Sequence, residues 1–255
     1  MWDQIRTAGF HDDRLEPGRL VVSASEICIE ALTPFIARVW RSVRARHLEW
    51  SVWDTVVHIN DDLYFYAAQV LLADESDYIC FELSADDHSN AERLLAAFTV
   101  QARLLAGSVA FADPDSRAHH VYGASDPGGF AAMGAVESLI HTYDALYGLD
   151  GASTWRPPDD LAVPILSRLF PHAPAGDVAS PGDVLLYMCG RTPLGALPRL
   201  TDWRWLRGGT GLRSAGTPSN PREQLTPERT VAACVPLNGS LGTGSKAEMS
   251  PNIQP

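Results

Sequence analysis

Apolar residues recur at spacings of three and four through most of the first 150 positions, and this is the period of an amphipathic helix. The first segment with this period, about residues 25–46, carries apolar residues at Ile29, Leu32, Ile36, Val39 and Val43. Three more such segments follow, at about residues 51–73, 90–107 and 130–147. The pattern therefore predicts four long helices.

Capping signals mark the ends of these helices. Ser51 and Asp54 in "SVWD" have the spacing of a capping box, which predicts that the second helix starts there. Ser89 or Asn90 is placed to cap the third helix. Gly148 stands where a helix-ending glycine is expected after the fourth.

The pattern changes after residue 150. Two shorter helices are predicted at "DLAVPILSRLFP" and "PGDVLLYMCGR", and from residue 208 on Gly, Ser, Thr, Pro and Asn dominate without any period. Between the second and third helices, residues 76–83 predict a short strand or an extended connection. We therefore predict an all-α protein with an N-terminal extension (1–24), a four-helix bundle (25–150), a small C-terminal helical appendage (151–207) and a disordered tail (208–255).

Composition and charge limit the classes of partner that the protein is expected to bind. The chain has 255 residues and a net charge of −11, and its one basic cluster, "RVWRSVRAR", is expected to lie on an exposed helix face. We therefore expect no nucleic-acid partner and no anionic membrane surface. With no run of about 18 apolar residues, no membrane span is predicted. The polar N-terminus and four scattered cysteines favour the cytoplasm, as a monomer or a homodimer.

The fourth predicted helix carries a polar stripe. Glu137, His141 and Asp144 in "GAVESLIHTYDALYG" stand at i, i+4 and i+7, which places them within about 60° of one another on a helix. A buried carboxylate costs several kcal/mol unless it is paired or bound to a metal. A polar stripe on a helix that faces the core therefore needs a partner.

The second predicted helix offers such a partner in His58, which has Asp54, Asp61 and Asp62 as helical neighbours. Two imidazoles and one carboxylate with an open fourth position form the ligand set of a catalytic divalent metal such as zinc. His58, Glu137 and His141 are therefore candidate metal ligands. Asp144 is a candidate either for an additional ligand or for an acceptor of the second ring nitrogen of His141.

Other interpretations of these residues stay open. The stripe is also compatible with a solvated i,i+4 pair or an internal hydrogen-bond network, and His58 with a structural histidine. The adjacent His119 and His120 fall in a predicted loop, where a surface role is expected. No serine-nucleophile elbow, glycine-rich phosphate loop or H-E-x-x-H motif is present in the sequence.

Several segments resemble a known family. "WSVWDTVVHINDDLYFYAAQ" is similar to the second-helix signature of the DinB-like, mycothiol-dependent maleylpyruvate isomerases, and "ESLIHTYDALYG" is similar to their fourth-helix motif. "LAVPILSRLFP", "DVLLYMCGRTPL" and "LTDWRW" resemble the C-terminal segment of many members. The resemblance spans about residues 25–206.

The resemblance implies a four-helix bundle that holds one divalent metal, usually zinc, through His58, Glu137 and His141. It also implies mycothiol, the low-molecular-weight thiol of actinobacteria, as cosubstrate. In the implied mechanism, the metal-bound thiolate attacks an electrophilic small molecule. In an isomerase the adduct then rotates and expels the thiol, whereas in a transferase the adduct is the product or a leaving group departs.

Two departures from the family pattern bear on the substrate. The family's Pro-Gly-Trp before the second helix is "LEW" here, and the larger C-terminal domain of fuller isomerases is replaced by the short appendage. Both favour an S-transferase or detoxification role over a strict isomerase. Arg191 in "CGRTPL" is a candidate clamp for a substrate carboxylate or for the thiol, or alternatively a helix C-terminal arginine. A non-catalytic metal-binding stress or accessory protein and a metal-free helical interaction module remain as alternatives.

Overall fold

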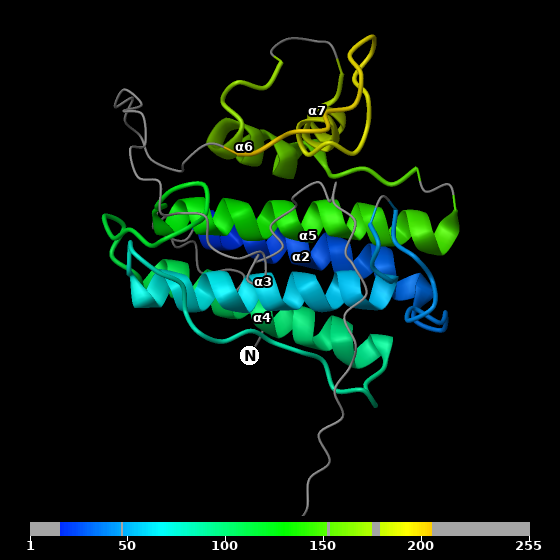
Figure 1. The fold of residues 1–255 in the computed structure, drawn as a ribbon, viewed down its shortest axis with the longest axis horizontal. Helices are drawn as coiled ribbons and strands as arrows, with labels where there is room; N and C mark the ends of the chain where they lie inside the picture. Colours follow the sequence, from blue (N-terminus) through cyan, green and yellow to red (C-terminus); the bar gives the residue numbers. More distant parts are fainter. Residues whose placement is uncertain (1–15, 47, 152–153, 175–178, 206–255) are drawn as a thin grey trace, which may run out of the picture.

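The computed structural model describes residues 16–46, 48–151, 154–174 and 179–205, and in these ranges the chain is all-helical (Figure 1). Six α-helices and one 3₁₀ turn form, and the same ranges contain no strand. The elements are α2 (Glu16–Leu32), η2 (Thr33–Phe35), α3 (Val52–Leu72), α4 (Ala91–Phe111), α5 (Pro127–Asp150), α6 (Asp159–Leu169) and α7 (Pro181–Met188). Residues 76–83 are an extended connection. The predicted tail at 208–255 lies outside the described residues.

Four long helices pack side by side. Both α2 and α3 pack against α4 and α5, so that the apolar faces of all four meet in one core (Figure 1). The two short helices lie on one side of this group, where α6 packs against α5 and α7 packs against α6. This arrangement places α5 between the other long helices and the C-terminal pair.

The predicted starts of the second and third helices are confirmed. Ser51 caps α3 with a complete capping box, in which its hydroxyl accepts from the Asp54 backbone N–H and the Asp54 carboxylate accepts from the Ser51 backbone N–H. Asn90 caps α4 through a hydrogen bond from the Arg93 backbone N–H to its side chain. These signals involve residues only three apart, which is why the sequence alone reveals them.

The predicted first helix at 25–46 is wrong at both ends, since α2 runs from Glu16 to Leu32. Residues 16–24, which were assigned to an N-terminal extension, therefore belong to a core helix. Past Leu32 only the short η2 turn forms, because Pro34 has no N–H to donate to a helical bond. The basic run after it lies in turns and bends rather than on a helix face.

The turn segment after α2 lies directly on α5. The backbone N–H of Arg46 donates to the carbonyl of Asp144 at 2.9 Å, and the Arg44 carbonyl points at Gly148. A Cβ atom at Gly148 would stand 2.3 Å from that carbonyl oxygen. Gly148 was predicted to end the helix, but α5 continues to Asp150 and ends at Gly151, which has a φ of 74°. The glycine at 148 is instead explained by the close approach of two backbones.

Nearly every residue of α5 is buried, on all sides of the helix. Its first turn starts with Pro127 after an Asp126 cap, and helices α2, α3, α4 and α6 surround the rest. The polar stripe predicted from the sequence therefore lies inside the protein: Glu137 and Asp144 have no exposed surface, and His141 is 1% exposed. A solvated pair of surface side chains is excluded for these positions.

Helix α4 is the one described helix that is long and apolar enough to cross a membrane by length and composition, with a mean hydropathy of 1.6. No span was predicted, because the sequence has no unbroken apolar run of that length. In the structure α4 packs against α2, α3 and α5, and 39% of its apolar window is buried. The core helices of soluble proteins pass the same test, so a single such helix is weak evidence for a membrane span.

Candidate metal centre

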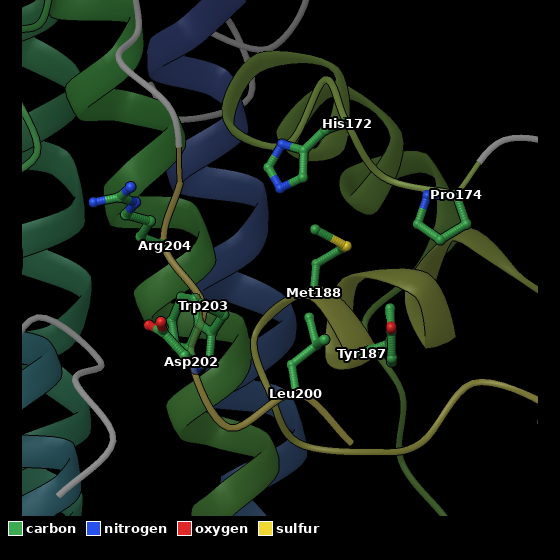
Figure 2. A pocket seen from close by; sticks show the side chains of 8 residues that line it. All are labelled: His172, Pro174, Tyr187, Met188, Leu200, Asp202, Trp203 and Arg204. Atoms are coloured by element: carbon green, nitrogen blue, oxygen red, sulfur yellow. The ribbon is translucent and has the colours of Figure 1, made fainter. Parts of the chain in front are cut away.

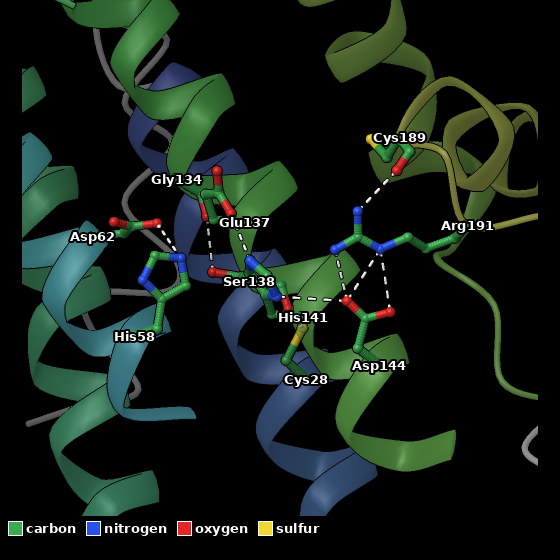
Figure 3. Close-up of polar contacts among 10 residues, drawn as sticks. All are labelled: Cys28, His58, Asp62, Gly134, Glu137, Ser138, His141, Asp144, Cys189 and Arg191. Carbon is green, nitrogen blue, oxygen red and sulfur yellow. Dashed lines mark hydrogen bonds and ion pairs between the residues drawn. The ribbon is translucent and has the colours of Figure 1, made fainter. Parts of the chain in front are cut away.

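Helices α3 and α5 bring three candidate ligands to one place. His58 projects from α3, and Glu137 and His141 project from α5 (Figure 3). One ligand atom from each side chain lies within 4.8 Å of the other two. The rings of His58 and His141 meet edge to face with centroids 4.9 Å apart. These three residues, which we call the metal triad, could therefore hold one metal ion.

A carboxylate contacts each imidazole of the triad. The Nε2 atom of His58 lies 3.1 Å from Oδ2 of Asp62, one turn further along α3. The Nε2 atom of His141 lies 3.1 Å from Oε2 of Glu137. The His58 side chain is 10% exposed, and the other three are buried almost completely. The site thus gathers two buried carboxylates around two imidazoles.

This donor set fits a divalent cation such as zinc. Two imidazole nitrogens and one carboxylate oxygen are a known ligand set of catalytic zinc, which keeps a fourth position for water or substrate. Burial, and after it the charge of Glu137, raises the pKa of Asp62 well above its usual value. A divalent ion would compensate the two negative charges that otherwise oppose each other in the core.

Asp144 lies behind the triad and pairs with Arg191. The Arg191 Nε atom lies 3.2 and 3.1 Å from the two Asp144 oxygens, and its Nη2 atom lies 2.7 Å from Oδ2 (Figure 3). Burial would raise the pKa of Asp144, but the charge of Arg191, the nearby His141 ring and the hydrogen bonds from Arg191 outweigh it, so the pKa is lowered. Asp144 is therefore an ionised carboxylate at neutral pH.

Arg191 comes from the segment that follows α7. Its Nη1 atom donates to the carbonyl of Cys189 at 2.8 Å, near the C-terminal end of that helix. This contact matches the alternative interpretation of Arg191 as a helix C-terminal arginine. Its predicted role as a substrate or thiol clamp stays a prediction.

Two residues at the site had no role in the sequence prediction. Trp50 covers the two imidazoles, with its ring centroid 4.9 Å from that of His58 and 6.3 Å from that of His141. Asp62 was noted only as a helical neighbour of His58. For Asp62, the i,i+4 spacing from His58 was the signal that the sequence offered. The position of Trp50 depends on how the loop before α3 folds back, which no local pattern reveals.

Cys28 on α2 lies close to the triad helix but is chemically inert. Its thiol donates to the backbone carbonyl of Ser138 at 3.3 Å. Complete burial raises the pKa of Cys28 to about 12, although a hydrogen bond with Thr142 lowers it in part. A thiol with such a pKa is not a nucleophile near neutral pH. Of the other cysteines that the structure describes, Cys189 is buried and Cys80 is exposed.

The prediction of a surface role for His120 is wrong. The turn at 118–125 folds inward, and His120 is only 3% exposed among aromatic rings. The ring neighbours are Tyr66, Tyr122, Phe130 and Trp205. The Nδ1 atom of His120 accepts a hydrogen bond from the Tyr122 backbone N–H at 3.2 Å, which assigns the proton of the neutral ring to Nε2.

Acid should destabilise the protein through His120. Burial lowers the pKa of His120 from 6.5 to about 4, although the charge of Glu137 acts in the opposite direction. The unfolded chain therefore takes up this proton before the folded chain does, and the free energy of unfolding falls as the pH drops from about 6.5 to about 4, by roughly 2–3 kcal/mol. Urea unfolding at pH 7, 5.5 and 4.5 should show this loss, and it should be smaller in His120→Gln. An equal loss in both proteins would contradict the prediction.

Two cavities lie away from the triad. One of about 540 Å³ is lined by Tyr187 and Met188 of α7 and by residues of the segments that follow α6 and α7, among them His172 and Trp203 (Figure 2). The other, of about 720 Å³, lies where the start of α2 meets α6 and the beginning of α5. No triad residue lines either cavity, and we assign neither to the chemistry of the triad.

Comparisons of the chain with models of known protein families, with curated proteins and with solved structures gave no match.

Proposed function

We propose that the protein is a metal-dependent, mycothiol-using S-transferase or isomerase. In this proposal α2, α3, α4 and α5 form a DinB-like four-helix bundle, and His58, Glu137 and His141 hold a divalent ion, with zinc as the expected metal. The observation that carries the proposal is the convergence of these three side chains from two helices to within 4.8 Å inside the core. The motif resemblance of the same residues to the mycothiol-dependent family supports it.

The chemistry follows from what such a site does to a thiol. A divalent ion bound there would favour the thiolate of mycothiol, which is the nucleophilic form. The thiol loses its proton to solvent and its sulfur forms a bond to a carbon of the electrophile. In a displacement the leaving group departs with the bonding pair, and in an addition the anion that forms on the electrophile takes up a proton from solvent. The side chains of α3 and α5 contribute position and burial: they orient the two imidazoles and keep water away from the reacting sulfur.

We favour a transferase that acts on a small electrophile over a strict maleylpyruvate isomerase. The support is in the sequence, where "LEW" replaces Pro-Gly-Trp before α3. The net charge of −11 supports a small-molecule substrate rather than nucleic acid. The same proposal places the protein in the cytoplasm as a monomer or homodimer.

The test is turnover with mycothiol. Zinc-loaded protein, mycothiol and a panel of electrophiles, including epoxides, alkyl halides, quinones and maleylpyruvate, are incubated together, and products are analysed by mass spectrometry. We expect a mass-shifted mycothiol adduct, or isomerised maleylpyruvate, that forms with the loaded protein and not with protein treated with a chelator. Omission of mycothiol is the second control.

The outcomes separate the alternatives. A protein that binds zinc but yields neither adduct nor isomer across the panel would be a non-catalytic metal-binding protein. A protein that binds no divalent ion would be a helical module whose triad is an internal hydrogen-bond network, and the proposal would be wrong.

A further inference from the structure

A buried ion pair joins the C-terminal helices to the triad helix. Arg191 is 6% exposed, Asp144 is fully buried, and the two make three nitrogen–oxygen contacts between 2.7 and 3.2 Å. Taking both charges out of water costs about as much as their attraction returns, so a buried ion pair is weak evidence for a role in stability. The structure of its surroundings indicates another role.

The direction of Arg191 is set by a left-handed glycine cap at the end of α7. Gly190 has a φ of 67°, and its backbone N–H donates to the Tyr187 carbonyl at 2.9 Å. The backbone N–H of Arg191 donates to the Leu186 carbonyl at 2.8 Å. Because both backbone bonds are made within the cap, the side chain leaves α7 in a fixed direction, toward α5.

On the other side of the pair, Asp144 faces the ring of His141. Its Oδ2 atom lies 3.5 Å from Nδ1 of His141, which is long for a hydrogen bond but within the range of an ion pair. The other ring nitrogen, Nε2, faces the Glu137 carboxylate of the triad. A carboxylate behind a metal-ligating histidine fixes the tautomer and the orientation of the ring.

We propose that Arg191 is a positioning residue for the metal triad, acting through Asp144 on His141. The Nε and Nη2 atoms of its planar guanidinium form a fork that holds the Asp144 carboxylate in one orientation. That carboxylate in turn holds Nδ1 of His141, so that Nε2 points into the triad. The segment after α7 thereby becomes a part of the metal centre that touches no ligand directly. The inference rests on the proposed function, because it presumes that the triad binds a divalent ion.

The test compares zinc affinity in the full chain. Arg191→Met removes the fork and leaves a side chain of similar length, and Arg191→Lys keeps the charge without the fork. Zinc dissociation constants are measured by competition with a chromophoric chelator, and the visible spectrum of the Co²⁺-loaded protein reports ligand geometry. We expect zinc to bind about 10–100-fold more weakly to Arg191→Met, with a changed Co²⁺ spectrum and partial recovery of affinity in Arg191→Lys.

Arg168→Met is the matched control. Arg168 on α6 pairs with Asp126 at the start of α5, so this variant also removes an ion pair between a C-terminal helix and α5. The lost pair, however, lies 15 residues before His141, about 22 Å along the helix. Its zinc affinity should equal that of the wild type even if its unfolding temperature falls.

The outcomes separate a failure of the role assigned to Arg191 from a failure of the proposed metal site. If wild type and Arg191→Met bind zinc equally and give the same Co²⁺ spectrum, the inference is wrong while the proposed metal site stands. If Arg168→Met loses as much affinity as Arg191→Met, the effect is general loosening and the inference is again wrong. If Arg191→Met does not fold, Arg191→Lys decides by the same two measurements. A wild type without affinity for zinc removes the premise and the inference together.

Discussion

Replacing His58 and His141 together by alanine is expected to abolish divalent-metal binding, whereas the wild type should hold about one ion per chain. The two imidazoles are two of the three protein ligands that the triad offers. Four-ligand structural zinc sites bind with roughly 10–16 kcal/mol, so the loss of two ligands removes about 5 kcal/mol, or more than about 10³-fold in affinity. Elemental analysis after purification without chelators, followed by titration with zinc, measures the difference.

Thermal unfolding provides an independent measurement of the loss of metal binding in the double variant. An ion that binds only the folded chain stabilises it by about 4 kcal/mol at a concentration 1,000-fold above its dissociation constant. Zinc should therefore raise the unfolding temperature of the wild type and leave that of the double variant unchanged. The matched control is His88→Ala with His172→Ala, which removes two exposed histidines. If this control loses the ion, or if the triad variant keeps it, the metal centre lies elsewhere.

Gly148→Ala is expected to destabilise the protein by roughly 3–4 kcal/mol, although alanine is the better helix former. The added Cβ would stand 2.3 Å from the Arg44 carbonyl oxygen and 3.3 Å from Cα of Ala45. A backbone carbonyl cannot rotate away as a side chain can. The turn must therefore move off α5 and give up the hydrogen bond between the Arg46 N–H and the Asp144 carbonyl. Urea unfolding monitored by circular dichroism measures the change.

Gly107→Ala serves as the matched comparison for this substitution. Gly107 is also a helical glycine, in α4, but a Cβ there would meet nothing within 4 Å. The same change should stabilise the protein by about 0.5–1 kcal/mol, because alanine lowers the conformational entropy of the unfolded chain. Equal effects at both positions would show that the contact between the Arg44 carbonyl and α5 is not tight in solution.

The sequence predicted those parts of the fold and of the site that depend on residues close together in the chain. The Ser51–Asp54 capping box and the Asn90 cap each lie within one helical turn, and the structure has both. The stripe of Glu137, His141 and Asp144 was visible for the same reason, since i, i+4 and i+7 share one face of any helix.

Other features depended on parts of the chain that meet only in three dimensions. The helical spacing continued through Ile36 and Val39 by coincidence, since both are exposed in the turn after α2. The reason for a glycine at 148 could be recognised only from the structure, where the Arg44 carbonyl lies against this position. Likewise, His120 was assigned to the surface because it falls in a loop, and only the structure shows that this loop folds inward.

Helix α5 has no face of its own toward solvent, and this has a consequence for how the protein tolerates change. The same two dozen residues fill the core and carry two of the three candidate ligands. A larger side chain on α5 would therefore displace a neighbouring helix, so we infer that changes near the triad are accommodated in the surrounding helices and in the loop that carries Trp50, with α5 itself kept nearly fixed.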